Sequence, residues 1–104
     1  PSINISQDER NISIDAEMPG LNKEEIALKF HNQGLEIIGE KKGKKIKKSG
    51  SSYSETSSYK GYKAFISMPS NVNIDEVEAK YEKDRLKIKI PKMKTKLGKN
   101  IEIN

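Results

Sequence analysis

Apolar and polar residues alternate along most of this chain. In the segment 11–18, NISIDAEM, apolar side chains occupy every second position, with acidic or hydroxyl side chains between them. Because neighbouring side chains of a β-strand point to opposite faces, this pattern predicts a strand with one buried and one solvated face. A Pro-Gly pair follows directly and predicts the end of that strand. The residues expected to point inward are Ile12, Ile14, Ala16 and Met18.

The same alternation recurs further along the chain. Strands are predicted at 24–31, 35–42, 59–69, 77–83 and 86–91, with one more short strand around Ile3 and Ile5. The inward positions of these segments are Ile26, Leu28, Phe30, Leu35, Ile37, Tyr62, Ala64, Ile66, Met68, Val77, Ala79, Tyr81, Leu86, Ile88 and Ile90. About seven short strands with closely spaced turns predict an all-β fold, an immunoglobulin-like antiparallel β-sandwich.

Turn residues separate these strands. Asn32-Gln33-Gly34 predicts a tight hairpin turn, with Gly34 available for a positive φ. The segment 70–75 follows a proline and predicts a turn that could include a short helical bend. No segment shows a sustained helical period.

The alternation stops between 43 and 58, GKKIKKSGSSYSETSS, where we expect a long loop with little apolar content beyond Ile46 and Tyr53. Lysines crowd the run Lys41–Lys48, so the positive excess of the chain, +5 overall, is local. A basic loop can contact phosphates, but a solvated, self-repelling loop is the simpler interpretation. The many hydroxyls of 49–58 fit loop composition better than a set of phosphorylation sites.

Length and composition restrict the function. A chain of 104 residues with 33% hydrophobic and 34% charged residues suits a single domain with a thin, strictly patterned core. It contains no apolar run of about 18 residues and opens without the features of a signal peptide, so neither a transmembrane helix nor export is expected. The absence of cysteine fits a reducing compartment, and we expect a cytoplasmic protein.

The sequence offers little for catalysis. Its one histidine, His31, falls on the solvated face of a predicted strand beside a turn, and we interpret it as an exposed surface residue. No nucleophile–base spacing, phosphate-cradling loop or metal-ligand cluster is evident. We therefore expect no enzymatic activity, no cofactor and no metal.

The last six residues, KNIEIN, depart from the usual polar chain end. Ile101 and Ile103 would share one face of an extended segment, which leaves them with no apolar surface of their own to cover. This pattern predicts that the two isoleucines bind a groove elsewhere.

Taken together, four stretches resemble the α-crystallin domain of the small heat-shock proteins, in its prokaryotic and plant-like form with a long loop between strands. They are IDAEMPGLNKEEIALKF (14–30), GLEIIGEKK (34–42), YKAFISMPSNVNIDEVEAKYEKDRLKIKIPK (62–92) and the terminal Ile101-Glu102-Ile103. The resemblance implies an α-crystallin domain over 1–91 and a C-terminal extension over 92–104 that carries the Ile-x-Ile motif.

Within these stretches the chain departs from the family pattern at two places. The usual Gly-Val before Leu86 is replaced by Asp84-Arg85, and aspartate tolerates a left-handed turn conformation better than most residues. The arginine often found in the strand before Met68 is replaced by Ala64, beside Lys63. A dimer-bridging salt link built on that arginine is therefore not carried over.

The resemblance implies an ATP-independent holdase, which would bind partly unfolded proteins and keep them from aggregating. Its partners would be itself, as a homodimer and higher oligomer, and unfolded clients, with no nucleic acid and no membrane. The tail Ile101, Glu102 and Ile103 would bind a groove of another subunit. The expected groove lining is Ile26, Leu28, Val77 and Ala79, and the expected dimer interface is Ile3, Asn4, Ile5, Ser6, Ser52, Tyr53, Ser54, Glu55 and Thr56.

Two other functions fit parts of the sequence. A β-sandwich co-chaperone or adaptor of the p23 type would share the build but would not need the Ile-x-Ile tail. A nucleic-acid-binding β-module could use the run Lys41–Lys48, but this run lacks interleaved aromatic residues.

Overall fold

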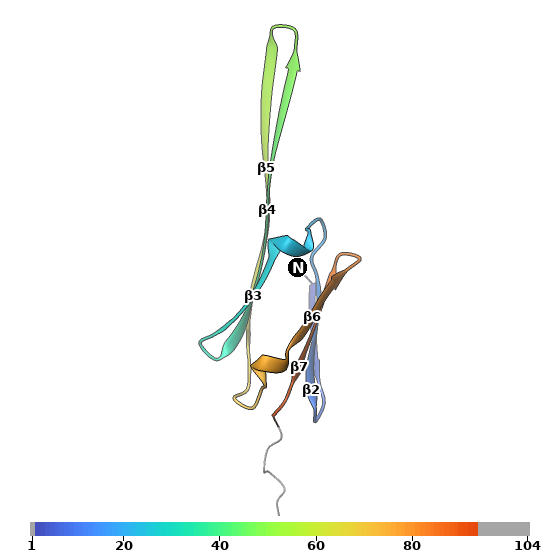
Figure 1. The fold of residues 1–104 in the computed structure, drawn as a ribbon, viewed down its shortest axis with the longest axis vertical. Coiled ribbons are helices and arrows are strands. Elements are labelled where there is room, and N and C mark those ends of the chain that lie inside the picture. The colour runs from blue at the N-terminus through green and yellow to red at the C-terminus, as the bar shows by residue number, and fades with distance from the viewer. Residues whose placement is uncertain (1, 94–104) are drawn as a thin grey trace, which may run out of the picture.

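The computed structural model describes residues 2–93 and confirms the all-β prediction (Figure 1). The strands are β1 (Ser2–Gln7), β2 (Asn11–Glu17), β3 (Ile26–His31), β4 (Gly34–Ser49), β5 (Ser52–Ser67), β6 (Glu78–Glu82) and β7 (Arg85–Pro91). Two single 3₁₀ turns, η1 (Lys23–Glu25) and η2 (Ile74–Glu76), connect them. A short helical bend was expected within 70–75, and η2 begins at the end of that segment and extends one residue past it.

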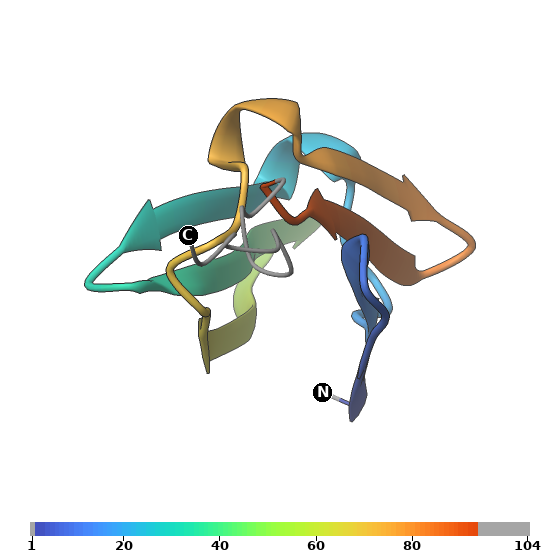
Figure 2. The same ribbon diagram turned by 90° about the horizontal axis from the view of Figure 1, so that it is seen from below.

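The strands form two antiparallel sheets. One has the order β1-β2-β7-β6 and the other the order β3-β4-β5, and Figure 2 shows them as separate layers of a sandwich. The core between them contains only apolar side chains among the described residues. Its buried members are Ile12, Ile14, Ala16, Met18, Leu21, Leu35, Ile37, Leu86, Ile88 and Ile90. The predicted inward faces of β2 and β7 are therefore confirmed.

The hairpin turn after β3 differs in detail from the prediction. Asn32 and Gln33 adopt positive φ values of 50° and 59°, whereas Gly34 lies within β4. Glycine is needed there for a different reason, because a Cβ at Gly34 would clash with the ring of Phe65 and with the backbone carbonyl of Ile66. The turn before β7 uses Lys83 and Asp84 in the left-handed region, as expected for Asp84.

The segment 43–58 is not a loop. Instead, β4 and β5 pair without interruption from Gly34↔Ser67 to Ser49↔Ser52, and a turn at Gly50, whose φ is 59°, joins them. The part of this hairpin from Glu40 to Gly61, hereafter the ribbon, projects beyond the sandwich at the top of Figure 1. At about 3.4 Å per residue, the ribbon is about 34 Å long. Alternation is missing here because neither face is covered by a second sheet.

The backbone remains attached to the sandwich slightly past the expected domain boundary at Pro91. The N–H of Lys92 donates to the carbonyl of Arg10 at 2.7 Å, and the N–H of Met93 donates to the carbonyl of Asn71 at 2.6 Å. The predicted tail, Ile101, Glu102 and Ile103, lies outside the described residues.

Candidate functional site

An apolar groove runs between β3 and β6, the edge strands of the two sheets on the same side of the sandwich. It encloses about 410 Å³. Its lining residues are Lys23, Ile26, Leu28, Ala79, Lys80, Tyr81 and Leu86. Of the four residues predicted for the tail groove, the structure brings together Ile26, Leu28 and Ala79.

Val77 does not join them. It follows η2, lies half-buried against the core, and lines a separate hollow with Asn11 and Pro91. Four lining residues were not predicted for the groove, namely Lys23, Lys80, Tyr81 and Leu86, and Tyr81 lies two positions after Ala79. Tyr81 was predicted to point inward, but alternation does not show that an inward residue at a sheet edge also lines the opening.

Two tyrosine hydroxyl groups bind the loop after β2, and one of them belongs to Tyr81 of the groove lining. The hydroxyl of Tyr81 donates to the carbonyl of Met18 at 2.6 Å, and that of Tyr62 donates to the carbonyl of Pro19 at 2.9 Å. Burial raises the pKa of Tyr81 above its ordinary value. The two bonds anchor β6 and β5 to the loop after β2, and the bond of Tyr81 holds one lining residue of the groove in position.

The chemistry of the groove suits apolar side chains. Ile26 and Leu28 are half-buried, and the small side chain of Ala79 leaves space between β3 and β6. Lys80 forms an ion pair with Glu82 at 2.9 Å. The site therefore offers an apolar floor with a charged rim, which fits apolar residues presented at every second position of a strand.

The predicted dimer-interface residues occupy two different sheets. Ile3 to Ser6 lie on β1, which pairs only with β2, so the outer edge of β1 is unpaired among the described residues. Ile5 points to the core side but is 52% exposed, because β1 is an edge strand. Ser52 to Thr56 lie at the tip of the ribbon on β5, whose outer edge is likewise unpaired within 2–93. The structure does not bring the two sets together within one chain.

Side chains on one face of the ribbon interact with one another. Glu55 forms an ion pair with Lys44 at 2.9 Å and accepts a hydrogen bond from the Tyr53 hydroxyl at 3.0 Å. The hydrogen bonds from Lys44 and then Tyr53 hold the pKa of the Glu55 carboxyl below its ordinary value. The ammonium of Lys48 lies 6.0 Å from the centroid of the Tyr53 ring. The exposed apolar side chains Ile46, Tyr53 and Tyr59 all lie on this face. Ile46 is paired with Glu55, and both tyrosines are separated from Glu55 by an even number of positions along β5.

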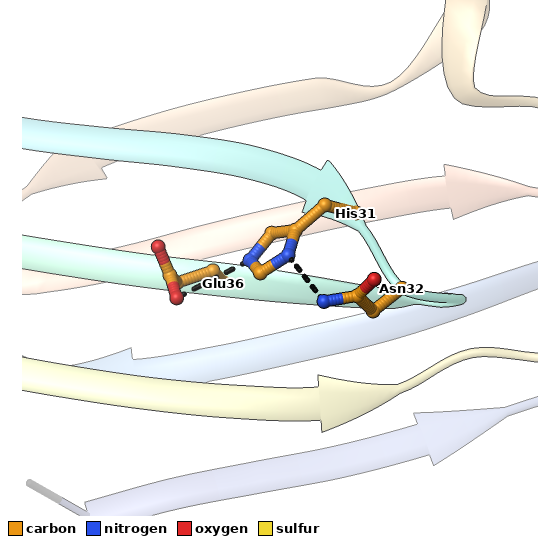
Figure 3. Close-up of polar contacts among 3 residues, drawn as sticks. All are labelled: His31, Asn32 and Glu36. Atoms are coloured by element: carbon orange, nitrogen blue, oxygen red, sulfur yellow. Dashed lines mark hydrogen bonds and ion pairs between the residues drawn. The ribbon is translucent and has the colours of Figure 1, made fainter.

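His31 is less exposed than expected. It lies on the outer face of the three-stranded sheet, but its side chain is only 33% exposed. Its Nε2 is 3.2 Å from Glu36, without the alignment of a hydrogen bond, and its Nδ1 is 3.1 Å from the Asn32 amide (Figure 3). The ring also packs edge-on against Phe65, with 5.6 Å between centroids. These contacts connect His31 to the hairpin turn and to β5.

Residues 2–93 contain no group of three or more His, Cys, Asp or Glu side chains placed to hold a metal ion. They also contain no helix that is long and apolar enough to cross a membrane.

Comparison with known proteins decides the family. A family model described as "Hsp20/alpha crystallin family" matches residues 4–104. The chain belongs to the Hsp20/α-crystallin family. It is 31% identical over 103 residues to small heat shock protein C2 of Rickettsia felis, and 32% identical over 104 residues to small heat shock protein C4 of the same organism. These matches cover 99% and 100% of this chain but only 67% and 64% of the two relatives.

Solved structures of this family have the same fold. Heat shock protein 16.0 from Schizosaccharomyces pombe matches with a TM-score of 0.71 and 25% identity, covering 100% of this chain and 82% of that one. A small heat-shock protein from Xylella fastidiosa matches with a TM-score of 0.70 and 22% identity, covering 100% of this chain and 95% of that one. The family and fold predictions from the sequence are thus confirmed, and the sandwich is an α-crystallin domain.

Proposed function

We propose that this Hsp20-family chain is an ATP-independent holdase of the cytoplasm. It would bind partly unfolded proteins without catalysis or cofactor and assemble through dimers into larger oligomers. The observation that carries the proposal is the apolar groove between β3 and β6, in a chain that also contains the alternating Ile101-Glu102-Ile103. Family membership supports the same role, and the Rickettsia relatives are described as small heat shock proteins.

In this proposal the groove receives the tail of another subunit. Ile101 and Ile103 would lie against Ile26, Leu28 and Ala79. Two buried isoleucines contribute about 3–6 kcal/mol gross, but ordering the tail and losing translational freedom offset much of this. One such contact is therefore weak, and it becomes effective when it is repeated around an oligomer. Residues 92–100 span at most about 30 Å when extended, which is enough to reach a neighbour.

The second assembly contact would join two unpaired strand edges. The outer edge of β1, with Ile3 to Ser6, would pair with Ser52 to Thr56 of a partner's ribbon. Two features support this: both edges are unpaired within residues 2–93, and the ribbon projects far enough to reach past its own sandwich. Tyr53 and the partner's Ile5 would then extend one apolar face.

Clients would bind where apolar surface and strand edges are exposed. Unfolding proteins expose the same kinds of surface, and strand edges bind extended segments through backbone hydrogen bonds. Ile46, Tyr53 and Tyr59 of the ribbon are each more than half exposed.

The decisive experiment heats an aggregation-prone client with this chain, with and without ATP, and follows light scattering and native mass. We expect suppression of scattering that ATP does not change. An equal amount of an unrelated basic protein serves as the control for non-specific protection. Equal scattering with this chain and with that control would contradict the proposal.

Two variants separate the assembly contacts. Replacing Ile101 and Ile103 by alanine should remove large assemblies and leave dimers. Replacing 42–59 by Asn-Gly deletes Ser52 to Thr56 and should therefore remove dimers. The shortened hairpin should still close, because Lys41 and Lys60 are already opposite each other and a two-residue turn joins them. Unchanged native masses of either variant would show that the corresponding contact is wrong.

A further inference from the structure

The net charge of this protein is concentrated in the ribbon. Between Glu40 and Gly61 there are seven lysines and two glutamates, a net charge of +5, which equals that of the whole chain. The remaining residues carry thirteen basic and thirteen acidic side chains. Six of the seven ribbon lysines belong to one strand, β4, and only Lys60 belongs to β5. The positive charge therefore lies along a single strand.

The two faces of that strand differ. On the face that carries Tyr53, three lysines have partners: Lys42 is 3.2 Å from Glu40, Lys44 is 2.9 Å from Glu55, and Lys48 lies over the Tyr53 ring.

On the other face, Lys41, Lys45 and Lys47 have no acidic partner within residues 2–93. Lys45 and Lys47 lie opposite Thr56 and Ser54, and Lys41 lies opposite Lys60. Like charges directly opposite each other destabilise a strand pair. An anion on this face would remove that cost.

The free edge of the ribbon lies along this same strand. β3 pairs with β4 only as far as Gly39, opposite Ile26, so on that side Glu40 to Ser49 has no neighbouring strand within the described residues. An unpaired edge presents backbone N–H and C=O groups at alternate residues. The opposite edge, on β5, carries hydroxyl and aromatic residues instead of lysines. One edge of the ribbon therefore combines unpaired backbone groups with lysines on both faces.

We propose that the outer edge of β4, from Glu40 to Ser49, binds an extended acidic polypeptide segment as an added strand. This inference deepens the proposed function and rests on it, because the acidic segments are taken to belong to client proteins. Residues i and i+2 of a strand are about 6.8 Å apart. The acidic side chains of an added strand would therefore lie directly opposite the lysines of β4. The same lysines repel the basic ribbon of a second copy, so the edge selects by repulsion as well as by attraction.

A polypeptide fits this edge better than nucleic acid does. A nucleic acid cannot continue the backbone hydrogen-bond ladder, and the unpaired lysines Lys41, Lys45 and Lys47 share their face with hydroxyl groups rather than aromatic rings. Stacking of bases, which strengthens single-strand binding, has no platform there. A peptide supplies both the charges and the backbone groups that this edge lacks.

The first test measures binding of a fluorescent peptide of about ten residues in which Glu and Thr alternate, a length that matches the free edge. Fluorescence anisotropy should show saturable binding, and a peptide with Lys in place of Glu should not bind. Replacing Lys41, Lys45 and Lys47 by glutamine should weaken binding by at least about tenfold.

The matched control replaces Lys63, Lys87 and Lys89 by glutamine. These lysines are exposed on the sandwich and have no ion pair among the described residues. Each triple variant removes three lysines and therefore lowers the net charge of +5 by the same amount. The control should change the affinity by less than about twofold. Equal weakening by the two variants would overturn the proposal, because it would show that only net charge matters.

A second peptide separates strand addition from plain charge attraction. In this peptide, alternate backbone nitrogens on the edge that faces β4 are methylated. The change keeps every charge of the peptide and removes its N–H donors to the backbone of β4. It should weaken binding by at least about tenfold. Equal affinity of the methylated and unmethylated peptides would overturn the strand-addition geometry. A single-stranded oligonucleotide of equal charge and vesicles rich in anionic lipid serve as competitors. Stronger binding of either of them than of the peptide would overturn the choice of partner.

Failure of this inference is distinguishable from failure of the proposed function. If the wild-type protein does not suppress aggregation of any heated client, the holdase proposal is wrong whatever the peptide does. If the wild-type protein and the ribbon triple variant protect an acidic client equally, the holdase proposal stands and the client assignment of this edge is overturned. Loss of protection of an acidic client in the ribbon variant alone supports the inference.

Discussion

The strands β4 and β5 pass through two regions of this protein that are stabilised in different ways. Within the sandwich, inward residues such as Leu35 and Ile37 are almost completely buried. In the ribbon, the same two strands continue with the same pairing, yet every residue from Glu40 to Gly61 except Gly43 is exposed. Strand pairing therefore persists where burial has ended. The sandwich is stabilised by the hydrophobic effect, whereas the ribbon depends on backbone pairing, a turn and a few side-chain contacts.

This difference assigns stability and recognition to separate regions. An isolated two-stranded hairpin is only marginally stable in water. The ribbon forms because its first residue pairs are already aligned by the sandwich, which removes much of the loop-closure cost. Its lysines and exposed aromatic residues therefore have little effect on the free energy of unfolding of the domain, which leaves them available for partners.

The largest expected effect tests this division with one substitution at two positions of β4. Ile37→Ala removes a buried side chain, 2% exposed, and should lower the free energy of unfolding by about 2–5 kcal/mol. Ile46→Ala, nine residues further along the same strand, removes a side chain that is 52% exposed. It should change that free energy by less than about 0.5 kcal/mol. Denaturant unfolding of the two variants measures both values, and similar losses would show that the ribbon is part of the cooperative core.

A smaller effect is expected for alanine at two glycines of β4. A Cβ at Gly39 would lie 2.5 Å from Leu21 Cδ1 and 2.7 Å from Met18 Cε. Both atoms belong to buried core residues, so Gly39→Ala should overpack the core and cost about 1–3 kcal/mol.

Gly43 supplies the matched control for this substitution. A Cβ there would meet only the side chain of Ser58, whose exposed hydroxyl can rotate away. Gly43→Ala should therefore be neutral or slightly stabilising, because alanine loses less backbone entropy than glycine. Thermal unfolding of both variants checks the pair, and a lower melting temperature for Gly43→Ala would contradict the division.

The same division explains what could be predicted from the sequence. Alternation identified β2 and β7 because one face of each strand contacts the core. It missed the part of the ribbon between 43 and 58 because an uncovered strand pair has two solvated faces and therefore no hydrophobic period. A signal for the hairpin was nonetheless present in Gly50, which supplies the turn between two segments of equal length.

The groove shows a second limit of prediction from alternation. Ile26, Leu28 and Ala79 line one groove, and this grouping follows from strand alternation and from the edge location of β3 and β6. Val77 lies apart from these three residues because it directly follows η2 and lines a separate hollow. Alternation shows on which side of a strand a residue lies, but not which neighbouring element it meets at an edge.

The smallest expected effect concerns the pH dependence of the ribbon. Hydrogen bonds from Lys44 and Tyr53 hold the pKa of Glu55 below its ordinary value of 4.5. A lowered pKa in the folded state means that the carboxylate stabilises the ribbon fully above 4.5. This contribution is lost as the pH falls through the pKa of the folded state. Because Glu55 is exposed, the gain is small and should affect the order of the ribbon rather than global unfolding.

NMR titration from about pH 6 to about pH 3 measures this effect, since it covers the carboxylate range. The amide signals of Tyr53 and Thr56 should move toward those of a disordered chain with a midpoint below 4.5, and Glu55→Gln should remove that transition. Glu82 supplies the comparison in the sandwich, because the contact with Lys80 also lowers its pKa. Protonation of Glu82 should leave β6 ordered, since Tyr81 packs against the core beside it. If β6 and the ribbon lost order together, their stability would be shared, and the separation of the two regions would be wrong.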